Sequence, residues 1–481
     1  MTDTASSETI TIVVKENCPT CVHIVPAIEQ MIESGLPVRV ISQDNPDFPE
    51  TVTQVINDRD LGQSWQLAIE IVPTAIRFSG DQEVDRVVGW NRPEWEAFSG
   101  LKHLAPELAE NRPGCGSLSL EPGRFEELEV RFKGDIMTSR RIAVDDYSDE
   151  METAFERGWS DGLPVVPPTE IRVMSMLRGT TRDPAEVIGN VPPNLSPCTV
   201  EKVAINAVMA GCKPEYLPVV LAAVEAALAD EFCMHGLLAT TWFSGPIAIV
   251  SGPVAKSIGM NWAENALGQG NRANSTIGRA LQLVIRNVGG GKPGEVDRST
   301  LGSPGKLGFC FAEDETDDFW PTIAMDQGRK RGDSAITLFA GDGVQGVLDQ
   351  KSRTPESLAK TFSESLKVVG HTKMVMASDA ILIVSPEHFR VFKDAGWSKE
   401  RLLQELDKNL LRPGAKLIVG ADGMDEGLPE KLKDKMFPKF RPGGLLIARA
   451  GGEAGMFSAI IGGWGATGSI GSVPSTQQVR S

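Results

Sequence analysis

The chain lacks several features that would place it in a common class of protein. Lysine and arginine total 48 against 64 aspartates and glutamates, so the formal charge is −16. Such an acidic chain has no positive field for a nucleic acid or an anionic membrane. The opening MTDTASSETI has no basic segment and no apolar run, and the later apolar runs are too short to span a bilayer. We therefore expect a cytoplasmic protein with neither nucleic acid nor membrane as a partner.

Familiar catalytic motifs are also scarce. The C-terminal two thirds contain no HExxH, GxSxG or DxD and no CxxC, which argues against a zincin or a serine hydrolase. Seven cysteines, an odd number spread along the chain, do not indicate a disulfide framework. In a reducing compartment such cysteines are catalytic, metal-binding or buried. We predict no metal site and no bound cofactor.

The N-terminal hundred residues do carry a motif, the cysteine pair in ENCPTC at 16–21. A β-branched strand, TITIVVK, precedes it, and VHIVPAIEQMIESG follows with the apolar spacing of a helix. Further strands are expected at LPVRVISQD, PTAIRF and EVDRVVGW, with helices at FPETVTQVIND and from near Pro93 onward. The expected order is β-α-β-α-β-β-α over residues 8–108.

This order, with the dithiol at the start of the first helix and a Val-Pro entering the third strand, resembles the thioredoxin/glutaredoxin family. The resemblance implies that Cys18 is an exposed nucleophile, its thiolate stabilised by the helix N-terminus, and that Cys21 resolves the mixed disulfide. It also implies that Pro73 is a cis proline facing the dithiol, with the preceding carbonyl free to pair with a bound substrate chain. The redox-active group is then the Cys18–Cys21 disulfide. Retention of the fold only as an interaction platform is the alternative.

Residues 109–144 are rich in glycine and proline and then in charge, which indicates a linker between domains at 1–108 and 145–481. Cys115 lies there in PGCGS, as either an accessible relay thiol or an incidental one. A zinc knuckle at CPTC would need a second Cys or His pair at matching spacing, and His23 and Cys115 do not provide it.

From residue 145 onward, helical and strand-like segments alternate, which predicts a larger mixed α/β domain, an α/β sandwich with functional loops at the strand ends. The expected helices are DEMETAFERGW, TVEKVAINAVMAGC, EYLPVVLAAVEAALADE, STIGRALQLVIRNV, PESLAKTFSESLKVVG and SKERLLQELDKNL. The expected strands are PIAIVSG, KLGFCFAE, AITLFAG, AILIVS, AKLIVGA, GGLLIARAGG and FSAIIGG.

Long stretches of this part, among them GWSDGLPVVPPTEIRV and NALGQGNRANSTIGRALQLVIRNVGGGKPGEVDRSTLGSPGKLGFCFAEDE, resemble an uncharacterised bacterial domain family. The resemblance covers roughly residues 145–480. Members of that family are found beside small cysteine- or selenocysteine-containing proteins of the UGSC type. The resemblance thus implies a small Cys/Sec partner protein.

The segment GQGNRANSTIGRA at 268–280 is the most polar candidate site in this part. Its glycines let a ligand approach the backbone, and the helix that follows attracts anions at its N-terminus. We expect it to bind a small anionic substrate, or else to be a well-capped helix after a polar loop. The candidate ligands are Asn271, Arg272 and Asn274, with Ser275 or Thr276 as the helix cap.

Four further side chains are candidates for chemistry. Cys198 precedes a helix, which is expected to lower its pKa and make it a second reactive thiol. Cys310 lies in an apolar strand, as a reactive thiol or as packing, and Glu313 follows at the strand end as a candidate general base. His235 is the leading imidazole among five histidines, for proton transfer or for a structural role.

These observations favour a thiol-disulfide oxidoreductase. The CPTC dithiol would exchange electrons with a substrate or cysteine site in the C-terminal domain, or with the small Cys/Sec partner. The alternative is a non-redox lyase or hydrolase acting on a small anionic substrate, with the thioredoxin-like domain as a docking module. The glycine-rich tail from 451 onward suggests a loop over a pocket or across a second subunit, and a homo-oligomer is expected.

Overall fold

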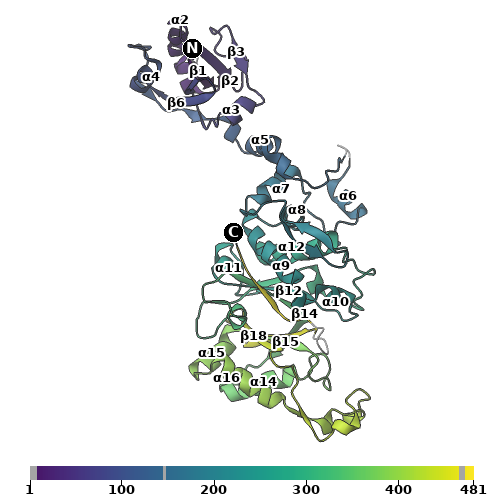
Figure 1. Ribbon diagram of the computed structural model, residues 1–481. Helices are drawn as coiled ribbons and strands as arrows, with labels where there is room; N and C mark the ends of the chain where they lie inside the picture. The colour runs from purple at the N-terminus through teal and green to yellow at the C-terminus, as the bar shows by residue number, and fades with distance from the viewer. Residues whose placement is uncertain (1–7, 145–147, 465–471, 481) are drawn as a thin grey trace, which may run out of the picture. The chain divides into compact units, whose positions relative to one another are not determined.

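The computed structural model describes residues 8–144, 148–464 and 472–480. The chain divides into two compact units, Met1–Asp135 and Ile136–Ser481, and Figure 1 labels many of their elements. The three tail glycines Gly465, Gly468 and Gly471 lie outside the described residues.

The first unit is built on a five-stranded sheet in the order β3-β2-β1-β5-β6. β1 is parallel to β2 and antiparallel to β5, so the sheet is mixed. The apolar β-branched residues of β1 are buried at its centre, as the uninterrupted apolar pattern predicts. The strands are β1 (Glu8–Val14), β2 (Val38–Ser42), β3 (Val55–Asn57), β5 (Thr74–Ser79) and β6 (Gln82–Val88).

Helices cover this sheet and close its core. The core contains Ile28 and Met31 of the second helix, with Trp95 and Phe98 of the fourth. The helices are α1 (Pro19–His23), α2 (Val25–Glu33), α3 (Gly62–Gln66), α4 (Arg92–Ser99) and α5 (Arg124–Lys133). This strand order, with a dithiol at the start of α1, confirms the expected thioredoxin-like fold of the first unit.

One expected helix of this unit is wrong. FPETVTQVIND, residues 48–58, forms turns and then the short strand β3 instead. The β-branched residues Val55 and Ile56 lose side-chain freedom in a helix, and in β3 they pair with β2 instead.

Residues 109–135, assigned to a linker from the sequence, pack within the first unit. β8 (Asn111–Arg112) pairs with β7 (Trp90–Asn91), and β9 (Cys115–Gly116) pairs with β4 (Ile71–Val72). The rings of Phe125 and Phe132 lie 5.3 and 6.2 Å from that of Trp65. Glycine and proline in this segment therefore mark short turns between paired strands rather than a free connection.

The second unit contains a seven-stranded sheet in the order β13-β12-β14-β19-β15-β18, with β20 paired to β14. Its halves repeat one arrangement, since β12 is parallel to β13 and antiparallel to β14, while β15 is parallel to β18 and antiparallel to β19. β14 and β19 join the halves. The strands are β12 (Gly245–Ser251), β13 (Phe309–Ala312), β14 (Ala335–Leu348), β15 (Asp379–Val384), β18 (Leu445–Arg449), β19 (Phe457–Gly463) and β20 (Ser475–Gln478).

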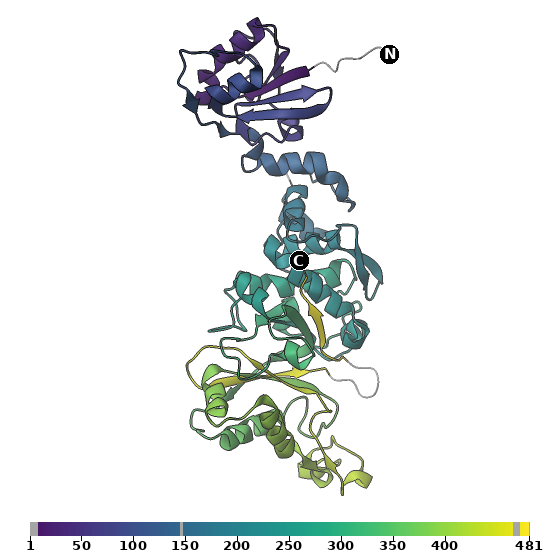
Figure 2. The ribbon, with the colours of Figure 1, turned by 60° about the vertical axis from the view of Figure 1, so that its left-hand side comes forward.

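The two halves of this sheet face each other across a shared core, in which Ile247 and Ile249 of β12 join Ile381 and Ile383 of β15. Helices cover the outer faces, so the unit has four layers, as Figures 1 and 2 show. On the β12 side lie α8 (Val200–Ala210), α9 (Leu217–Leu228) and α12 (Arg272–Asn287). On the β15 side lie α14 (Pro355–Leu366), α15 (Pro386–Asp394) and α16 (Lys399–Leu410). The α/β sandwich expected from the alternating pattern is confirmed.

Shorter elements complete the second unit. They are α6 (Glu150–Glu156), α7 (Glu170–Leu177), β10 (Val187–Val191), β11 (Ser196–Thr199), α10 (Met234–Ala239), α11 (Pro253–Ser257), α13 (Ile323–Asp326), β16 (Arg412–Pro413) and β17 (Met436–Phe437). The expected strand AKLIVGA is wrong, because residues 415–421 form parts of two short 3₁₀ helices and the turns between them, in which Leu417 is buried and Ile418 makes an isolated bridge. None of the described helices is both long and apolar enough to cross a membrane.

Candidate functional site

The two cysteines of CPTC lie at the start of α1, where the sequence places them. Cys18 is the N-cap residue in an extended conformation, and its sulfur accepts the backbone N–H of Cys21 at 3.4 Å. When it is protonated, the Cys18 thiol also donates to the carbonyl oxygen of Val72 at 3.6 Å. The sulfur of Cys21 accepts the backbone N–H of Lys15 at 3.5 Å. The end of β1, the start of α1 and Val72 therefore meet at the two thiols.

The two thiols are electrostatically unlike each other. Hydrogen bonds from the side chain of Cys21, and then from that of Cys115, lower the pKa of Cys18 to about 5. Burial, and then the bond that Cys21 makes to Cys18, raise the pKa of Cys21 far above its usual range. The site therefore holds a thiolate beside a thiol that keeps its proton, which is the charge distribution that thiol-disulfide exchange requires.

The Val72–Pro73 peptide bond is cis, as the resemblance implies. The backbone before Pro73 is not free, however. Val72 lies in β4 and pairs with Cys115 of β9, while the Cys18 thiol occupies its carbonyl. A bound substrate chain cannot use this edge while β9 lies there.

The expectation that Cys18 is exposed is wrong, since both Cys18 and Cys21 are 0% exposed. Residues 113–116, which we name the strap, lie beside the dithiol. The hydroxyl of Thr20 donates to the carbonyl of Pro113 at 2.6 Å, and Nζ of Lys15 donates to that of Gly116 at 2.8 Å. Local sequence does not reveal this cover, because the strap comes from a segment far along the chain.

Most polar side chains at the start of α12 bond to other parts of the protein. Asn271 caps the helix by accepting the N–H of Asn274, so the expected cap at Ser275 or Thr276 is wrong. Arg272 donates to the carbonyls of Gly211 and Cys212. The buried side chain of Asn274 bonds to Asn261 and Ala266. The Thr276 hydroxyl donates to the Arg272 carbonyl, whereas Ser275 is exposed.

The two thiols proposed as relays in the second unit are deeply buried. Cys198 lies in β11, and burial raises its pKa to about 11, so the expectation of a lowered pKa is wrong. The helix there is capped by Thr199, so the Cys198 sulfur is not at its N-terminus. Cys310 in β13 is 5% exposed, and burial raises its pKa strongly. Both thiols are therefore protonated at neutral pH.

Glu313 is buried, whereas His235 is exposed. Glu313 is 4% exposed at the end of β13, where it accepts from the Ser251 hydroxyl at 2.7 Å and from the Ile323 N–H. Burial raises its pKa to about 7, which suits a group that exchanges protons near neutrality. His235 is exposed on α10. Within the described ranges, no hydrogen bond or ion pair joins Cys198, His235, Arg272 and Glu313.

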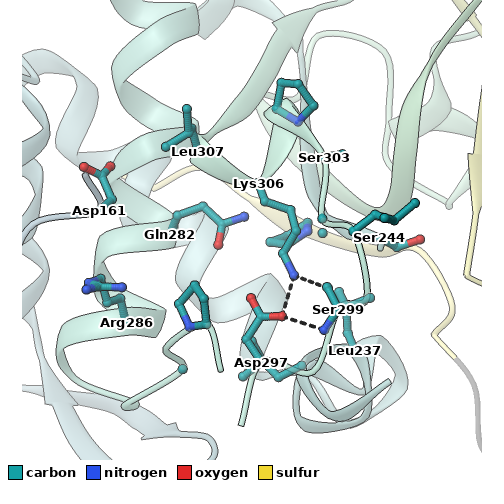
Figure 3. Close-up of a pocket in the computed structure, with 18 of the residues that line it drawn as sticks. Asp161, Leu237, Ser244, Gln282, Arg286, Asp297, Ser299, Ser303, Lys306 and Leu307 are labelled. Atoms are coloured by element: carbon teal, nitrogen blue, oxygen red, sulfur yellow. Dashed lines mark hydrogen bonds and ion pairs between the residues drawn. The ribbon is translucent and has the colours of Figure 1, made fainter. Parts of the chain in front are cut away.

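A cavity of about 470 Å³ opens instead in the second unit, between α12 and the segment 291–307 (Figure 3). Gln282 and Arg286 project from α12, and Lys306 reaches toward Asp297 and Ser299. Nζ of Lys306 lies 2.7 Å from the Asp297 carboxylate. Asp161, also on the wall, is held by Arg279 with two bonds of 2.8 Å.

Three residues that line this cavity each have a buried polar atom for which the described part of the chain provides no hydrogen-bond partner. Among the described residues, Nε2 of Gln282, Nε of Arg286 and Oγ of Ser303 are buried without a partner. Both acids on the wall already face a cation, which leaves Arg286 as surplus positive charge. Buried donors without partners favour a ligand that supplies acceptor oxygens.

Sequence reasoning missed this cavity, although it lies within the stretch that resembles the uncharacterised family. The available signal was the run of glycine, proline and serine between α12 and β13, with Gln282 and Arg286 four residues apart on one helix face. In the described part of the chain, no three His, Cys, Asp or Glu side chains are grouped so as to hold a metal ion.

Comparison with known proteins adds little to this geometry. No family model and no curated protein matches the chain. Among solved structures, the chain is similar to StoA from Bacillus subtilis at 11% identity and a TM-score of 0.18, covering 21% of this chain and 86% of that one. The thioredoxin-like assignment of the first unit therefore rests on its own strand order and on the placement of Cys18, Cys21 and Pro73.

Proposed function

We propose that the first unit is a thiol-disulfide oxidoreductase in which Cys18 is the nucleophile and Cys21 the resolving thiol. The observation that carries the proposal is the pairing of a Cys18 thiolate, whose pKa is about 5, with the buried, protonated thiol of Cys21 three residues later. A sulfur with a lowered pKa reacts at neutral pH and is also a good leaving group.

The reaction transfers two electrons to a disulfide R–S–S–R′. The Cys18 thiolate attacks one sulfur, forms Cys18–S–R and releases R′–S⁻, which takes a proton. Cys21 then loses its proton and attacks the sulfur of Cys18, which breaks the mixed disulfide and releases R–S⁻. Cys18 and Cys21 are oxidised to a disulfide, and the partner is reduced to two thiols.

We favour a redox partner for Cys18 whose reacting sulfur is not one of the buried cysteines of the second unit. Cys198 and Cys310 are buried and protonated, so neither presents a thiolate to a second domain. A small protein with an exposed cysteine or selenocysteine would present an accessible sulfur or selenium atom for this exchange. Such a protein agrees with the partner that the resemblance implies.

A redox titration with alkylation and peptide mass spectrometry tests this function. In wild-type protein, Cys18 and Cys21 should titrate together as one two-electron couple. Cys18→Ser should abolish the couple, whereas Cys212→Ser, a matched change of a buried thiol in the second unit, should leave it intact. If Cys18 and Cys21 stay reduced at every accessible potential, the first unit is a platform and the proposal fails.

The cavity in the second unit supports a second candidate function, the binding of a small anionic substrate for lyase or hydrolase chemistry. Its unused donors on Gln282, Arg286 and Ser303 favour carboxylate or phosphate oxygens.

The experiment is a thermal-shift titration with malonate and with inorganic phosphate. Wild-type protein should be stabilised in a saturable way, and Arg286→Leu should lose the shift. Lys330→Met, which removes an exposed cation outside the cavity wall, should keep it. Equal shifts in wild-type protein and Arg286→Leu would reject the site.

A further inference from the structure

The strap places a third sulfur at the dithiol. β9 pairs with β4 in the antiparallel register Val72↔Cys115 and Ile71↔Gly116. The Cys18 thiol donates to the carbonyl of Val72, so Cys115 lies across the strand pair from the residue that Cys18 contacts. Cys115 also helps to lower the pKa of Cys18, while burial, and then the neighbouring Cys18, raise the pKa of Cys115.

The three sulfurs differ in their access to solvent. Cys18 and Cys21 are 0% exposed, whereas Cys115 is only partly buried. A thiol or disulfide from outside therefore meets Cys115 first. Cys18 becomes reachable only if the strap leaves the edge of β4.

The strap is held in place by several independent contacts. The Thr20 hydroxyl and Nζ of Lys15 bond to its two ends, at Pro113 and Gly116. Gly114 lies so close to β4 that an added Cβ would be 2.3 Å from Cγ2 of Ile71 and 2.7 Å from the Val72 carbonyl oxygen. The close approach of Cys115 to the dithiol is thus built into the packing of the unit.

We propose that Cys115 is a third catalytic thiol, which forms a disulfide with Cys18 in alternation with Cys18–Cys21 and exchanges electrons with outside thiols. This inference rests on the proposed function of the first unit. It assigns a chemical role to a segment that reads from sequence as part of a linker.

The proposed cycle needs no oxidant other than the Cys18–Cys21 disulfide. In the oxidised unit, Cys115 loses its proton and attacks the sulfur of Cys18, the Cys18–Cys115 bond forms, the Cys18–Cys21 bond breaks, and Cys21 takes up the proton. An outside thiol R–SH then attacks the sulfur of Cys115, and Cys18 leaves as the stable thiolate. A second R–SH attacks Cys115–S–R and releases R–S–S–R with a free Cys115 thiol. Two thiols are oxidised and the Cys18–Cys21 disulfide is reduced, and the same steps run in reverse when R–S–S–R is the oxidant.

Glutathione and its disulfide serve as the probe, with the full-length chain. Cys21→Ser treated with glutathione disulfide should yield a Cys18–Cys115 cross-linked peptide by non-reducing mass spectrometry. Cys115→Ser should still form Cys18–Cys21 at equilibrium but exchange with glutathione about tenfold more slowly, because the remaining sulfurs are covered.

A second experiment displaces the strap and measures the rate of exchange with glutathione again. Gly114→Ala, added to Cys115→Ser, should restore rapid exchange by uncovering Cys18. Gly116→Ala in the same background should not, because an added Cβ there meets nothing within 4 Å. This matched pair separates loss of the thiol from movement of the strap.

The outcomes distinguish this inference from the function on which it rests. If wild-type protein forms no Cys18–Cys21 disulfide with the probe, the proposed function itself is wrong. If that disulfide forms, but Cys115→Ser exchanges at the wild-type rate or Cys21→Ser gives no Cys18–Cys115 link, only the role of Cys115 is overturned.

Discussion

Cys115 pairs through its backbone with Val72, the residue whose carbonyl accepts the Cys18 thiol and whose peptide bond to Pro73 is cis. One strand pair therefore joins a segment that reads as a linker to the centre of a thioredoxin-like fold. The dithiol of this protein is enclosed by its own chain.

The stability of the reduced first unit should depend on the charge of Cys18. Its pKa falls from 9.0 to about 5 on folding, so folding favours the thiolate. This contribution is complete above about pH 9 and is lost as the pH falls toward 5. Cys21 stays protonated in the folded state across this window and does not offset the effect. Denaturant unfolding at several pH values should show the difference between wild-type protein and Cys18→Ser shrinking with acidification. A difference that stays constant from pH 9 to 5 would contradict the assignment.

Residues 109–135 should be needed for the first unit to fold fully. A fragment of residues 1–135 keeps β8, β9 and the contacts of Phe125 and Phe132 with Trp65. A fragment of residues 1–108 loses all of these and uncovers Cys18. We expect the shorter fragment to melt at a lower temperature and to be alkylated faster at Cys18, as measured by calorimetry and by mass spectrometry. Equal melting temperatures would show that the segment is a linker after all.

Glu313 should make the second unit less stable as the pH rises. Burial raises its pKa from 4.5 to about 7, so the folded state favours the protonated form. The protein thus loses stability between about pH 4.5 and 7, and no further above that range. The Tm of Glu313→Gln relative to wild type should increase across this interval. Asp318→Asn, whose side chain is 87% exposed, is the control and should show no such trend.

The ion pair between Asp161 and Arg279 should stabilise the second unit. It is bidentate, and its side chains are only 11% and 15% exposed, so removing one partner leaves a poorly solvated charge. Asp161→Asn should lower the free energy of unfolding by about 3 kcal/mol in denaturant titrations. The exposed pair of Arg331 with Asp318, broken by Asp318→Asn, should cost no more than about 1 kcal/mol. Similar losses for the two variants would be inconsistent with this view.

Local sequence patterns determined most of the secondary structure and the identity of the dithiol. The buried strand β1, the helix that follows CPTC, and the long helices α9, α12 and α16 form where their apolar periods place them. These features depend on residues within a few turns of one another, so the sequence carries their signal directly. The helix expected at 48–58 is absent, and Val55 and Ile56 at its end pair with the neighbouring strand β2 instead.

The tertiary structure decided which side chains share a site. It separated Arg272, Glu313, His235 and Cys198, and it placed Cys115 beside Cys18. It also gathered unused donors of α12 around a cavity, and it buried Cys18, whose local motif suggests exposure. The physical reason is that burial, pairing and pKa are set by contacts between segments distant in the chain, and periodicity does not reveal which segments meet.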